Sequence, residues 1–389
     1  MENNLYVGLG TDLPFDELMQ MLNDAFDFTA SGRDFRNLLP KLYRPEARPQ
    51  DENHIVSENG KCVATVGAYS HTLRVCGVKI PCRGVGNVAV LKEARSKGYM
   101  NLAMKDAMDK MVRDGVALST LGGRRQRYRY FGYEKIGPLF QFSVARENIR
   151  HTYGTSDPDP AYALTRVTEN DRETLHWIHD FAASDVFAPV RAEENFLRIA
   201  ETWHNSLWLV RKNGEAIGYL IGKGNDTVVE ILLTDEKDFM PVIVALHTVW
   251  DRSGLTVRLP AYQDRYIREI YPVAESFLVT FSMSYNVLRY KTVCDAFLKL
   301  KTTYTRIPDG KLNLFVHGYA KDERITLSVK DNVASVTETP VGETADLELG
   351  HVDAMNLLFA LYSPDRDRLP DFAKLWFPLP IFMYTADEV

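Results

Sequence analysis

Apolar and polar residues alternate along the first part of the chain in patterns that predict a short helix pair and a loop, followed by a set of strands. Residues 14–25 place apolar side chains at the three- and four-residue spacing of a helix face. Residues 54–91 are rich in Val, Ile and Thr, and the pairs Asn59-Gly60 and Cys76-Gly77 interrupt them. Because such pairs favour tight turns between strands, this segment predicts a meander.

The pattern then changes to that of a helix between two strands. An apolar strand is predicted at residues 86–91, and residues 99–114 carry apolar side chains on one helical face before a glycine stop at Gly115. Apolar runs at residues 116–121 and 140–145 predict two further strands. The first unit of the chain is therefore predicted to be a mixed β/α domain.

Two further units are expected after a polar stretch at residues 151–160, which contains Gly, Ser, Asp and Pro and is typical of a linker. The second unit has helical patterns at residues 170–183 and 192–203. A hairpin, a strand, a helix with a glycine stop and another strand follow in the order seen in the first unit. No Arg-rich glycine turn precedes that helix, so we interpret the unit as a degenerate copy without a phosphate site. From about Val293 onward, short strands, a helix and a Pro- and aromatic-rich tail predict an α+β domain.

Composition and charge narrow the class of protein. The net charge is −6, which argues against an extended nucleic-acid surface. No run approaches the ~20 apolar residues of a membrane span, and the four cysteines lack the spacing of a metal or disulfide motif. These features predict a cytoplasmic protein without membrane segments. The pair His176 and His179 has a spacing compatible with a metal, but no third ligand is evident, so no metal is expected.

The segment with the clearest chemistry runs from Val88 to Met100. The strand residues Val88-Ala89-Val90 are followed by Arg95-x-x-Gly98, and the helix starts there. At such a turn, free backbone N–H groups and the positive end of the helix point to one place, and glycine permits close approach of a phosphate. A pyrophosphate is therefore expected on the amides near residues 96–100.

This segment resembles the coenzyme A loop of the GNAT acetyltransferase superfamily, written (Q/R)xxGx(G/A), with Met100 in place of the small last residue. The turn Phe131-Gly132 before the next strand matches the order of that superfamily. The three-part layout is similar to the enhanced intracellular survival (Eis) type, which joins an active GNAT domain, a degenerate GNAT domain and a sterol-carrier-like domain. The resemblance implies a fold that combines α/β and α+β parts.

The domains implied are a catalytic domain at residues 1–150, a degenerate domain at 151–290 and a sterol-carrier-like domain at 291–389. The resemblance also implies acetyl-CoA as cosubstrate and a set of coenzyme-binding residues, which are Val88, Val90, Arg95, Ser96, Lys97, Gly98, Tyr99 and Met100.

By the same resemblance, Tyr128 is the general acid and the free carboxylate of Val389 is the general base. Tyr130 is the alternative general acid. The segment between the preceding strand and Tyr128 is more basic than is usual in the family and longer by a residue or two, which leaves the position of the general acid open between the two tyrosines. These roles suit acetyl transfer to an amine, since alkyl amines hold their proton up to a pKa of ~10.4 and a departing thiolate benefits from a proton donor. The amide of Val90 is expected to polarise the thioester carbonyl.

The function expected is transfer of acetyl from acetyl-CoA to a primary amine, such as an aminoglycoside-like compound, a polyamine or a lysine side chain. The alternative is a non-catalytic acyl-CoA- or lipid-binding protein, which would need neither Tyr128 nor a free Val389. By the resemblance, a homo-oligomer is also expected.

Overall fold

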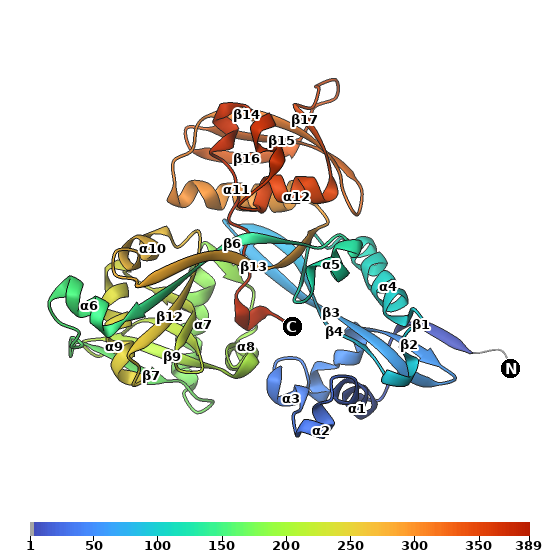
Figure 1. Ribbon diagram of the computed structural model, residues 1–389, viewed down its shortest axis with the longest axis horizontal. Helices are drawn as coiled ribbons and strands as arrows, with labels where there is room; N and C mark the ends of the chain where they lie inside the picture. Colours follow the sequence, from blue (N-terminus) through green and yellow to red (C-terminus); the bar gives the residue numbers. More distant parts are fainter. Residues whose placement is uncertain (1–3) are drawn as a thin grey trace.

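The computed structural model describes residues 4–389 and shows three units around a central sheet (Figure 1). Within these residues, one 13-stranded sheet has the order β1-β2-β3-β4-β5-β13-β6-β12-β11-β10-β9-β7, with β8 paired to β3. Its strands are β1 (Leu5–Leu9), β2 (Asn53–Glu58), β3 (Lys61–Val75), β4 (Val78–Val90), β5 (Leu118–Leu121), β6 (Glu134–Ala145), β7 (Tyr162–Arg166), β8 (Phe187–Pro189), β9 (Asn205–Lys212), β10 (Glu215–Lys223), β11 (Thr227–Leu233), β12 (Gly254–Pro260) and β13 (Ser276–Val287).

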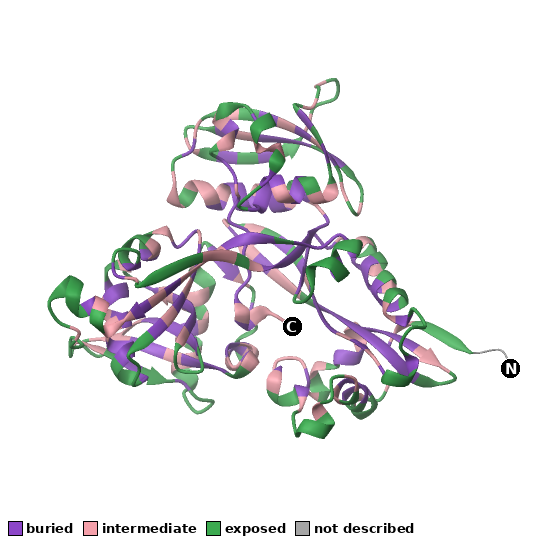
Figure 2. Ribbon diagram, in the orientation of Figure 1, coloured by how far each residue is buried: buried purple, intermediate pink, exposed green. Residues whose placement is uncertain are grey.

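Helices cover this sheet and link its strands. They are α1 (Phe15–Ala25), α2 (Phe28–Ser31), α3 (Phe35–Leu38), α4 (Tyr99–Arg113), α5 (Arg125–Tyr128), α6 (Arg146–Tyr153), α7 (Arg172–Ser184), α8 (Phe196–Ala200), α9 (Phe239–Val249) and α10 (Asp264–Ile270). Figure 2 shows that buried residues line the strands and the inner helix faces, while the outer helix faces are exposed.

The first unit confirms the predicted meander and both helices. The turns fall at Asn59-Gly60 and Cys76-Gly77, and all four residues have positive φ angles between 47° and 82°. This conformation matches the twist of the strands on either side. α1 and α4 each turn an apolar face inward, with buried methionines at Met19, Met104 and Met108 among others.

The strand β13 was not predicted, and it joins the first unit to the middle one. It pairs antiparallel with β5 on one side and with β6 on the other. β6 begins at Glu134, six residues before the predicted strand at 140, and also pairs with β12. The two units therefore share one continuous sheet.

The middle unit repeats the order of the first unit, as predicted: β9, β10 and β11 are antiparallel neighbours, and β12 follows α9 and pairs parallel to β11. The predicted helix at 170–183 is confirmed as α7. The helix predicted at 192–203 is wrong in extent, because it is broken into α8 and short 3-10 turns, and Trp203 and His204 have positive φ angles of 63° and 60° that a helix cannot contain. The predicted linker at 151–160 begins within α6, which ends at Gly154 in a left-handed conformation.

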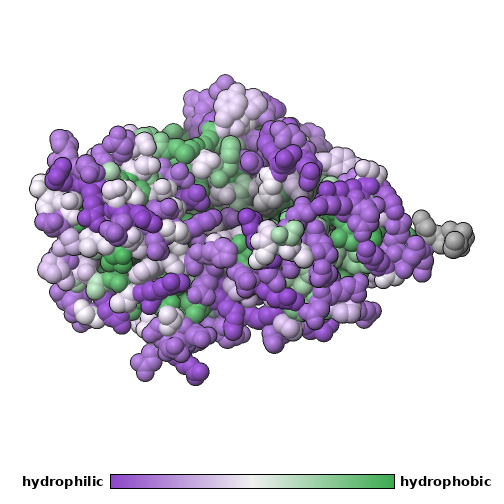
Figure 3. All heavy atoms as spheres, turned by 60° about the horizontal axis from the view of Figure 1, so that its bottom comes forward, coloured by the Kyte–Doolittle hydropathy of each residue, from purple (hydrophilic) through white to green (hydrophobic). Residues whose placement is uncertain are grey.

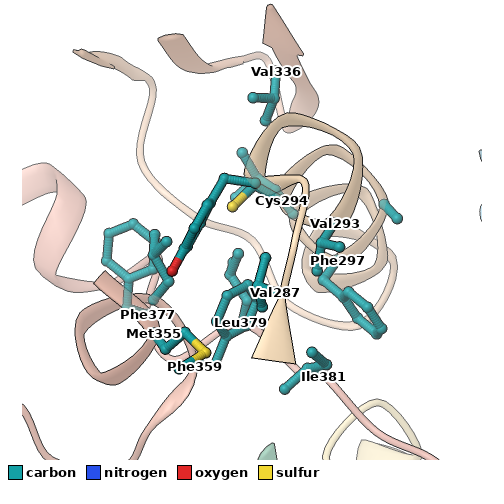
Figure 4. Close-up of a cluster of buried hydrophobic side chains, with 14 of the residues drawn as sticks. Val287, Val293, Cys294, Phe297, Val336, Met355, Phe359, Phe377, Leu379 and Ile381 are labelled. Atoms are coloured by element: carbon teal, nitrogen blue, oxygen red, sulfur yellow. The ribbon is translucent and has the colours of Figure 1, made fainter. Parts of the chain in front are cut away.

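The third unit has its own four-stranded sheet, in the order β16-β15-β14-β17. Its elements are α11 (Tyr290–Tyr304), β14 (Gly310–His317), β15 (Asp322–Lys330), β16 (Val333–Glu338), β17 (Leu347–Gly350), α12 (His351–Phe359) and α13 (Asp371–Lys374). α11 was not predicted, since its three threonines and its valine disfavour a helix and only burial of its apolar face favours one. Figure 4 shows this core, where Phe297 of α11 and Phe359 of α12 pack with Leu379 and Ile381 of the tail.

The apolar stretch at the end of α12 belongs to this core. Leu357, Leu358 and Phe359 are fully buried, whereas Tyr362 is exposed. The last residues of the tail leave the third unit and end between the other two (Figure 1). The face seen in Figure 3 is mostly hydrophilic, with hydrophobic side chains in small separate patches. No helix in residues 4–389 combines the length and apolar character needed to cross a membrane.

Candidate active site

The site begins where β4 and β5 separate. The two strands pair in parallel only from Cys82 opposite Leu118 to Val85 opposite Leu121. Beyond that point β4 has a bulge, with Asn87 at a φ of 51° and a shift in its register against β3. Leu91 donates its amide to Val63 of the first unit at 2.9 Å. Because amides alternate in direction along a strand, that of Val90 points to the opposite edge, where β5 has diverged.

The turn after β4 presents free amides at the start of α4. Ser96 and Gly98 have positive φ angles of 67° and 79°. Within residues 4–389 the amides of Ser96, Lys97 and Gly98 meet no acceptor, and no side chain caps the helix at Gly98. Such a turn concentrates N–H donors and the positive helix end at one place, which suits an anion.

A cavity of about 550 Å³ lies over this turn and the free edge of β4. Seven of the eight predicted coenzyme-binding residues line it, which are Val88, Val90, Arg95, Ser96, Gly98, Tyr99 and Met100. Arg127 lines it too, and the sequence signal for this residue was the basic run before Tyr128. Phe26, just beyond α1, lines it as well, and no sequence signal pointed to that residue.

Lys97 is the predicted residue that does not line this cavity. Its Nζ lies 2.8 Å from Oε2 of Glu58 in β2, and Tyr99 donates its hydroxyl to Oε1 of the same carboxylate at 2.8 Å. The hydrogen bond to Glu58 raises the pKa of Lys97. Lys97 therefore ties the turn to β2 rather than facing the cavity.

Tyr128 and Tyr130 differ sharply in their environment. Tyr128 is 6% exposed and its ring packs against Gly123, whereas Tyr130 is 82% exposed. Burial raises the pKa of the Tyr128 hydroxyl, and the neighbouring Arg127 partly offsets this effect. A buried tyrosine with a raised pKa holds its proton until a stronger base forms nearby.

The turn after Tyr128 is held by residues from other units. Asn286 of β13 donates its side-chain amide to the carbonyl of Phe131 at 2.9 Å. His351 of α12 lies 3.0 Å, through its Nε2, from the carbonyl of Gly132. Burial lowers the pKa of His351 to about 4, so the ring is neutral at pH 7 and donates this hydrogen bond.

The chain terminus lies against β4 at two glycines. A Cβ atom on Gly84 would lie 2.7 Å from a methyl group of Val389, and one on Gly86 would lie 2.9 Å from the carboxyl carbon. Both distances are below van der Waals contact, so only glycine leaves room for the terminal residue at these positions. Val389 packs against the same hydrophobic cluster that contains Tyr128.

The residue before the terminus, Glu388, carries a half-buried carboxyl group. Glu388 lines a cavity of about 300 Å³ together with Gln141 and Arg258. Burial raises the pKa of Glu388 to about 7, while the charges of Lys41 and Arg258 partly offset this effect. The end of the chain thus brings the carboxyl group of Val389 to β4 and that of Glu388 to a cavity beside β6 and β12.

The remaining arginines of the basic run have other partners. Arg125 forms an ion pair with the buried carboxylate of Glu134, and Nε of Arg129 lies 3.5 Å from the same group. Arg124 is exposed. Of this run, only Arg127 lines the cavity over the turn.

The middle unit contains a larger cavity of about 760 Å³ beyond the end of β11. Carboxylates line it, and these are Asp185, Asp235, Glu236 and Asp264. Arg265 and Arg268 line it too, and each is paired with one of these carboxylates, Arg265 with Glu236 and Arg268 with Asp264.

No group of three or more His, Cys, Asp or Glu side chains in the described part of the chain is arranged to hold a metal ion. Nδ1 of His176 lies 3.1 Å from Glu193, and Nε2 of His179 lies 3.2 Å from the carbonyl of Arg191. Both rings therefore have partners within the middle unit.

Comparison with known proteins identifies the first unit. Residues 10–136 match the family model described as an acetyltransferase (GNAT) domain. No curated protein matches the sequence of the chain.

Three solved structures share the fold over nearly their whole length. A GCN5-related N-acetyltransferase from Anabaena variabilis has a TM-score of 0.67 at 14% identity, with 98% of this chain and 97% of that chain covered. A GCN5-related N-acetyltransferase from Kribbella flavida has a TM-score of 0.61 at 17% identity, with 90% of this chain and 86% of that chain covered. Eis1 from Mycobacterium abscessus has a TM-score of 0.57 at 11% identity, with 90% of this chain and 87% of that chain covered. Residues 10–136 therefore match a GNAT acetyltransferase domain, and they do so within an overall fold that the chain shares with these three proteins.

Proposed function

We propose that the chain is an acetyl-CoA-dependent N-acetyltransferase in which a primary amine attacks the thioester directly. The observation that carries the proposal is that a single strand, β4, borders the cavity at Val88 and Val90 and contacts the chain terminus at Gly86. At about 3.3 Å per residue, these positions are about 7 to 13 Å apart. An acyl donor and a proton acceptor would then meet on one strand.

The residues around the cavity suit acetyl-CoA. The free amides of residues 96–98 and the positive end of α4 would hold the pyrophosphate, and Arg95 and Arg127 would add positive charge. The free edge of β4 would pair with the amide groups of the pantetheine arm. When bound, the coenzyme supplies an activated acyl thioester.

The residues of the site would divide the proton transfers between them. The Val389 carboxylate accepts a proton from the acceptor ammonium, which frees the nitrogen lone pair for attack. The Val90 amide stabilises the negative charge that develops on the carbonyl oxygen. As the new C–N bond forms and the C–S bond breaks, the Tyr128 hydroxyl donates its proton to the leaving sulfur, the nitrogen releases its remaining extra proton to water, and the tyrosinate takes a proton back from water.

The acceptor in this proposal is a cationic amine, of the aminoglycoside-like, polyamine or lysine type. The carboxyl groups of Glu388 and Val389 at the end of the chain would attract such a molecule. We further expect the third unit to be sterol-carrier-like, with domains bounded near residues 150 and 290, and the chain to form a cytoplasmic homo-oligomer. Native mass spectrometry tests the oligomer.

A thiol-release assay tests the function. Untagged protein and a chain that ends at Ala386 are mixed with acetyl-CoA and a panel of aminoglycosides, polyamines and lysine peptides. We expect amine-dependent thiol release from the full chain, at least 100-fold less from the shortened one, and unchanged acetyl-CoA affinity in calorimetry. Tight acetyl-CoA binding without release for any amine would favour the non-catalytic acyl-CoA- or lipid-binding alternative.

A further inference from the structure

Charged side chains from two different units converge on the last residues of the chain. The last residues of the tail leave the third unit and lie between the first and middle units (Figure 1). Chain termini are usually poorly ordered unless specific contacts hold them. Here the contacts involve one lysine from the first unit and one arginine from the middle unit.

Lys41 is the contact from the first unit. Its Nζ donates hydrogen bonds to the carbonyl oxygens of Ala386 at 2.7 Å and Glu388 at 2.6 Å. Burial lowers the pKa of Lys41 to about 8, although the nearby carboxylate of Asp387 partly opposes this effect. One ammonium group thus fixes the backbone on both sides of Asp387.

Arg191 is the contact from the middle unit. Its guanidinium bonds the carboxylate of Asp387 through two nitrogens at 3.0 and 2.7 Å, and that of Glu230 in β11 through two nitrogens at 2.8 Å each. The side chains of Arg191, Glu230 and Asp387 are 4%, 1% and 9% exposed. The charge of Arg191 holds the pKa of Asp387 below its usual range, against the raising effect of burial.

Stability alone does not account for this arrangement. Burying a charged triad costs several kcal/mol of desolvation, and apolar side chains of similar volume often stabilise a protein as well or better. Buried ion pairs do, however, fix geometry, because a guanidinium fork accepts a carboxylate in few orientations. A function that needs Val389 at one position on β4 would explain why charges hold the residues just before it.

We propose that Lys41 and Arg191 are positioning residues that hold the tail so that the Val389 carboxylate stays against Gly86 of β4. The catalytic consequence rests on the proposed function, in which this carboxylate accepts the proton of the amine. The proton acceptor is then assembled from all three units: the third supplies the tail, and the other two fix it.

The first test measures release of the tail and needs no catalysis. Carboxypeptidase is added to the full-length, untagged protein, and loss of Val389 is followed by intact mass. We expect Lys41→Met and Asp387→Asn to be trimmed at least tenfold faster than the wild type. Asp387→Asn leaves the Arg191–Glu230 pair in place, so it weakens the tail contact without leaving a buried charge unpaired. Trimming at the wild-type rate in both variants would overturn the proposal.

A matched control separates tail release from general destabilisation. Arg146 donates hydrogen bonds to the carbonyls of Arg252 and His247 within the middle unit. Arg146→Met therefore removes a comparable set of contacts far from the tail, and we expect trimming at the wild-type rate. Fast trimming of this control would show that loosening of the middle unit, not the Arg191 contact, releases the tail, and would contradict the proposal.

The second test links the tail to catalysis. In Lys41→Met and Asp387→Asn we expect kcat to fall at least tenfold while the Kd for acetyl-CoA stays within twofold. Arg191→Lys should retain more of the wild-type kcat than Arg191→Met, because lysine keeps the positive charge although it lacks the two-pronged hydrogen bonding of the guanidinium. Faster trimming with an unchanged kcat would overturn the positioning role. If the wild type acetylates no amine, the proposed function fails, and the trimming rates alone still decide whether these residues hold the tail.

Discussion

Gly86 is the residue at which the catalytic proposal can be tested with a single methyl group. An alanine Cβ there would lie 2.9 Å from the carboxyl carbon and 3.1 Å from the carboxyl oxygen of Val389, so the terminus must move. Gly86 has no positive φ angle, so alanine fits the backbone. Because misplacing a catalytic group by about 1 Å can cost about 100-fold in rate, we expect Gly86→Ala to lower kcat about 10- to 100-fold.

Steady-state kinetics check this expectation, with Gly254→Ala as control. Gly254 also lies in a strand without a positive φ angle, and the nearest atom to a Cβ there is 3.9 Å away. The control should keep the wild-type kcat. An unchanged kcat in Gly86→Ala would argue against a role for the terminal carboxylate.

The two tyrosines of the basic segment make a second prediction at this scale. We expect Tyr128→Phe to lower kcat about 100-fold or more, as is usual for loss of a general acid, with the Kd for acetyl-CoA unchanged. Tyr130 is 82% exposed, so Tyr130→Phe should leave kcat within twofold. The reverse result would assign the proton donor to Tyr130.

At the scale of elements, the proposed phosphate site at the turn before α4 predicts that acetyl-CoA affinity depends on charge as well as on shape. Gly98 has a φ of 79°, so any side chain strains it, but glutamine and glutamate strain it about equally. We expect Gly98→Glu to bind acetyl-CoA at least tenfold more weakly than Gly98→Gln, because its carboxylate would face the pyrophosphate. Calorimetry at low and high salt measures both affinities. Because salt screens the repulsion between the carboxylate and the pyrophosphate, high salt should reduce the difference in acetyl-CoA affinity between the two variants. Equal affinities would contradict a phosphate site at this turn.

The half-buried carboxyl group of Glu388 makes the stability of the folded chain depend on pH. Its pKa is raised from 4.5 to about 7, so the folded chain binds more protons than the unfolded chain between these values. Stability from this group is complete below pH 4.5 and is lost as pH rises through 7. The loss is on the order of 3 kcal/mol at most. Denaturant unfolding of the wild type and Glu388→Gln between pH 4 and 8 should show the variant gaining relative stability as pH rises, and parallel curves would contradict the prediction.

The sequence predicted correctly those elements whose conformation depends on residues that are adjacent in the chain. The turns at Asn59-Gly60 and Cys76-Gly77, and the glycine turn before α4, depend on a few adjacent residues. β13 was missed because its pairing with β5 and β6 joins segments more than 130 residues apart. The contact between Arg191 and Asp387 spans 196 residues, so no local signal could indicate it.

At the scale of the whole molecule, the third unit is not a separable domain in terms of packing. One hydrophobic cluster contains Leu73 and Ile80 from the long hairpin of the first unit, Leu118 of β5, and Phe297 and Trp376 of the third unit, all of them fully buried. Exposing one side of such a cluster to water costs about 25 cal/mol per Å² of apolar surface, and a domain usually has only about 5–15 kcal/mol of stability. The unit therefore stabilises the fold in addition to delivering the tail.

A chain that ends at Leu288 tests this expectation. Without the third unit, the apolar ends of the long hairpin and of β5 would face water, and the support that His351 gives to the turn after Tyr128 would be lost. We expect this chain to aggregate or to lack a cooperative thermal transition in calorimetry. A chain lacking only Asp387–Val389 should unfold cooperatively, within a few degrees of the full chain, since it loses the tail contacts but keeps the shared core. Cooperative unfolding of the chain that ends at Leu288 would show that the first two units fold independently, and the third would then serve only to deliver the carboxylate.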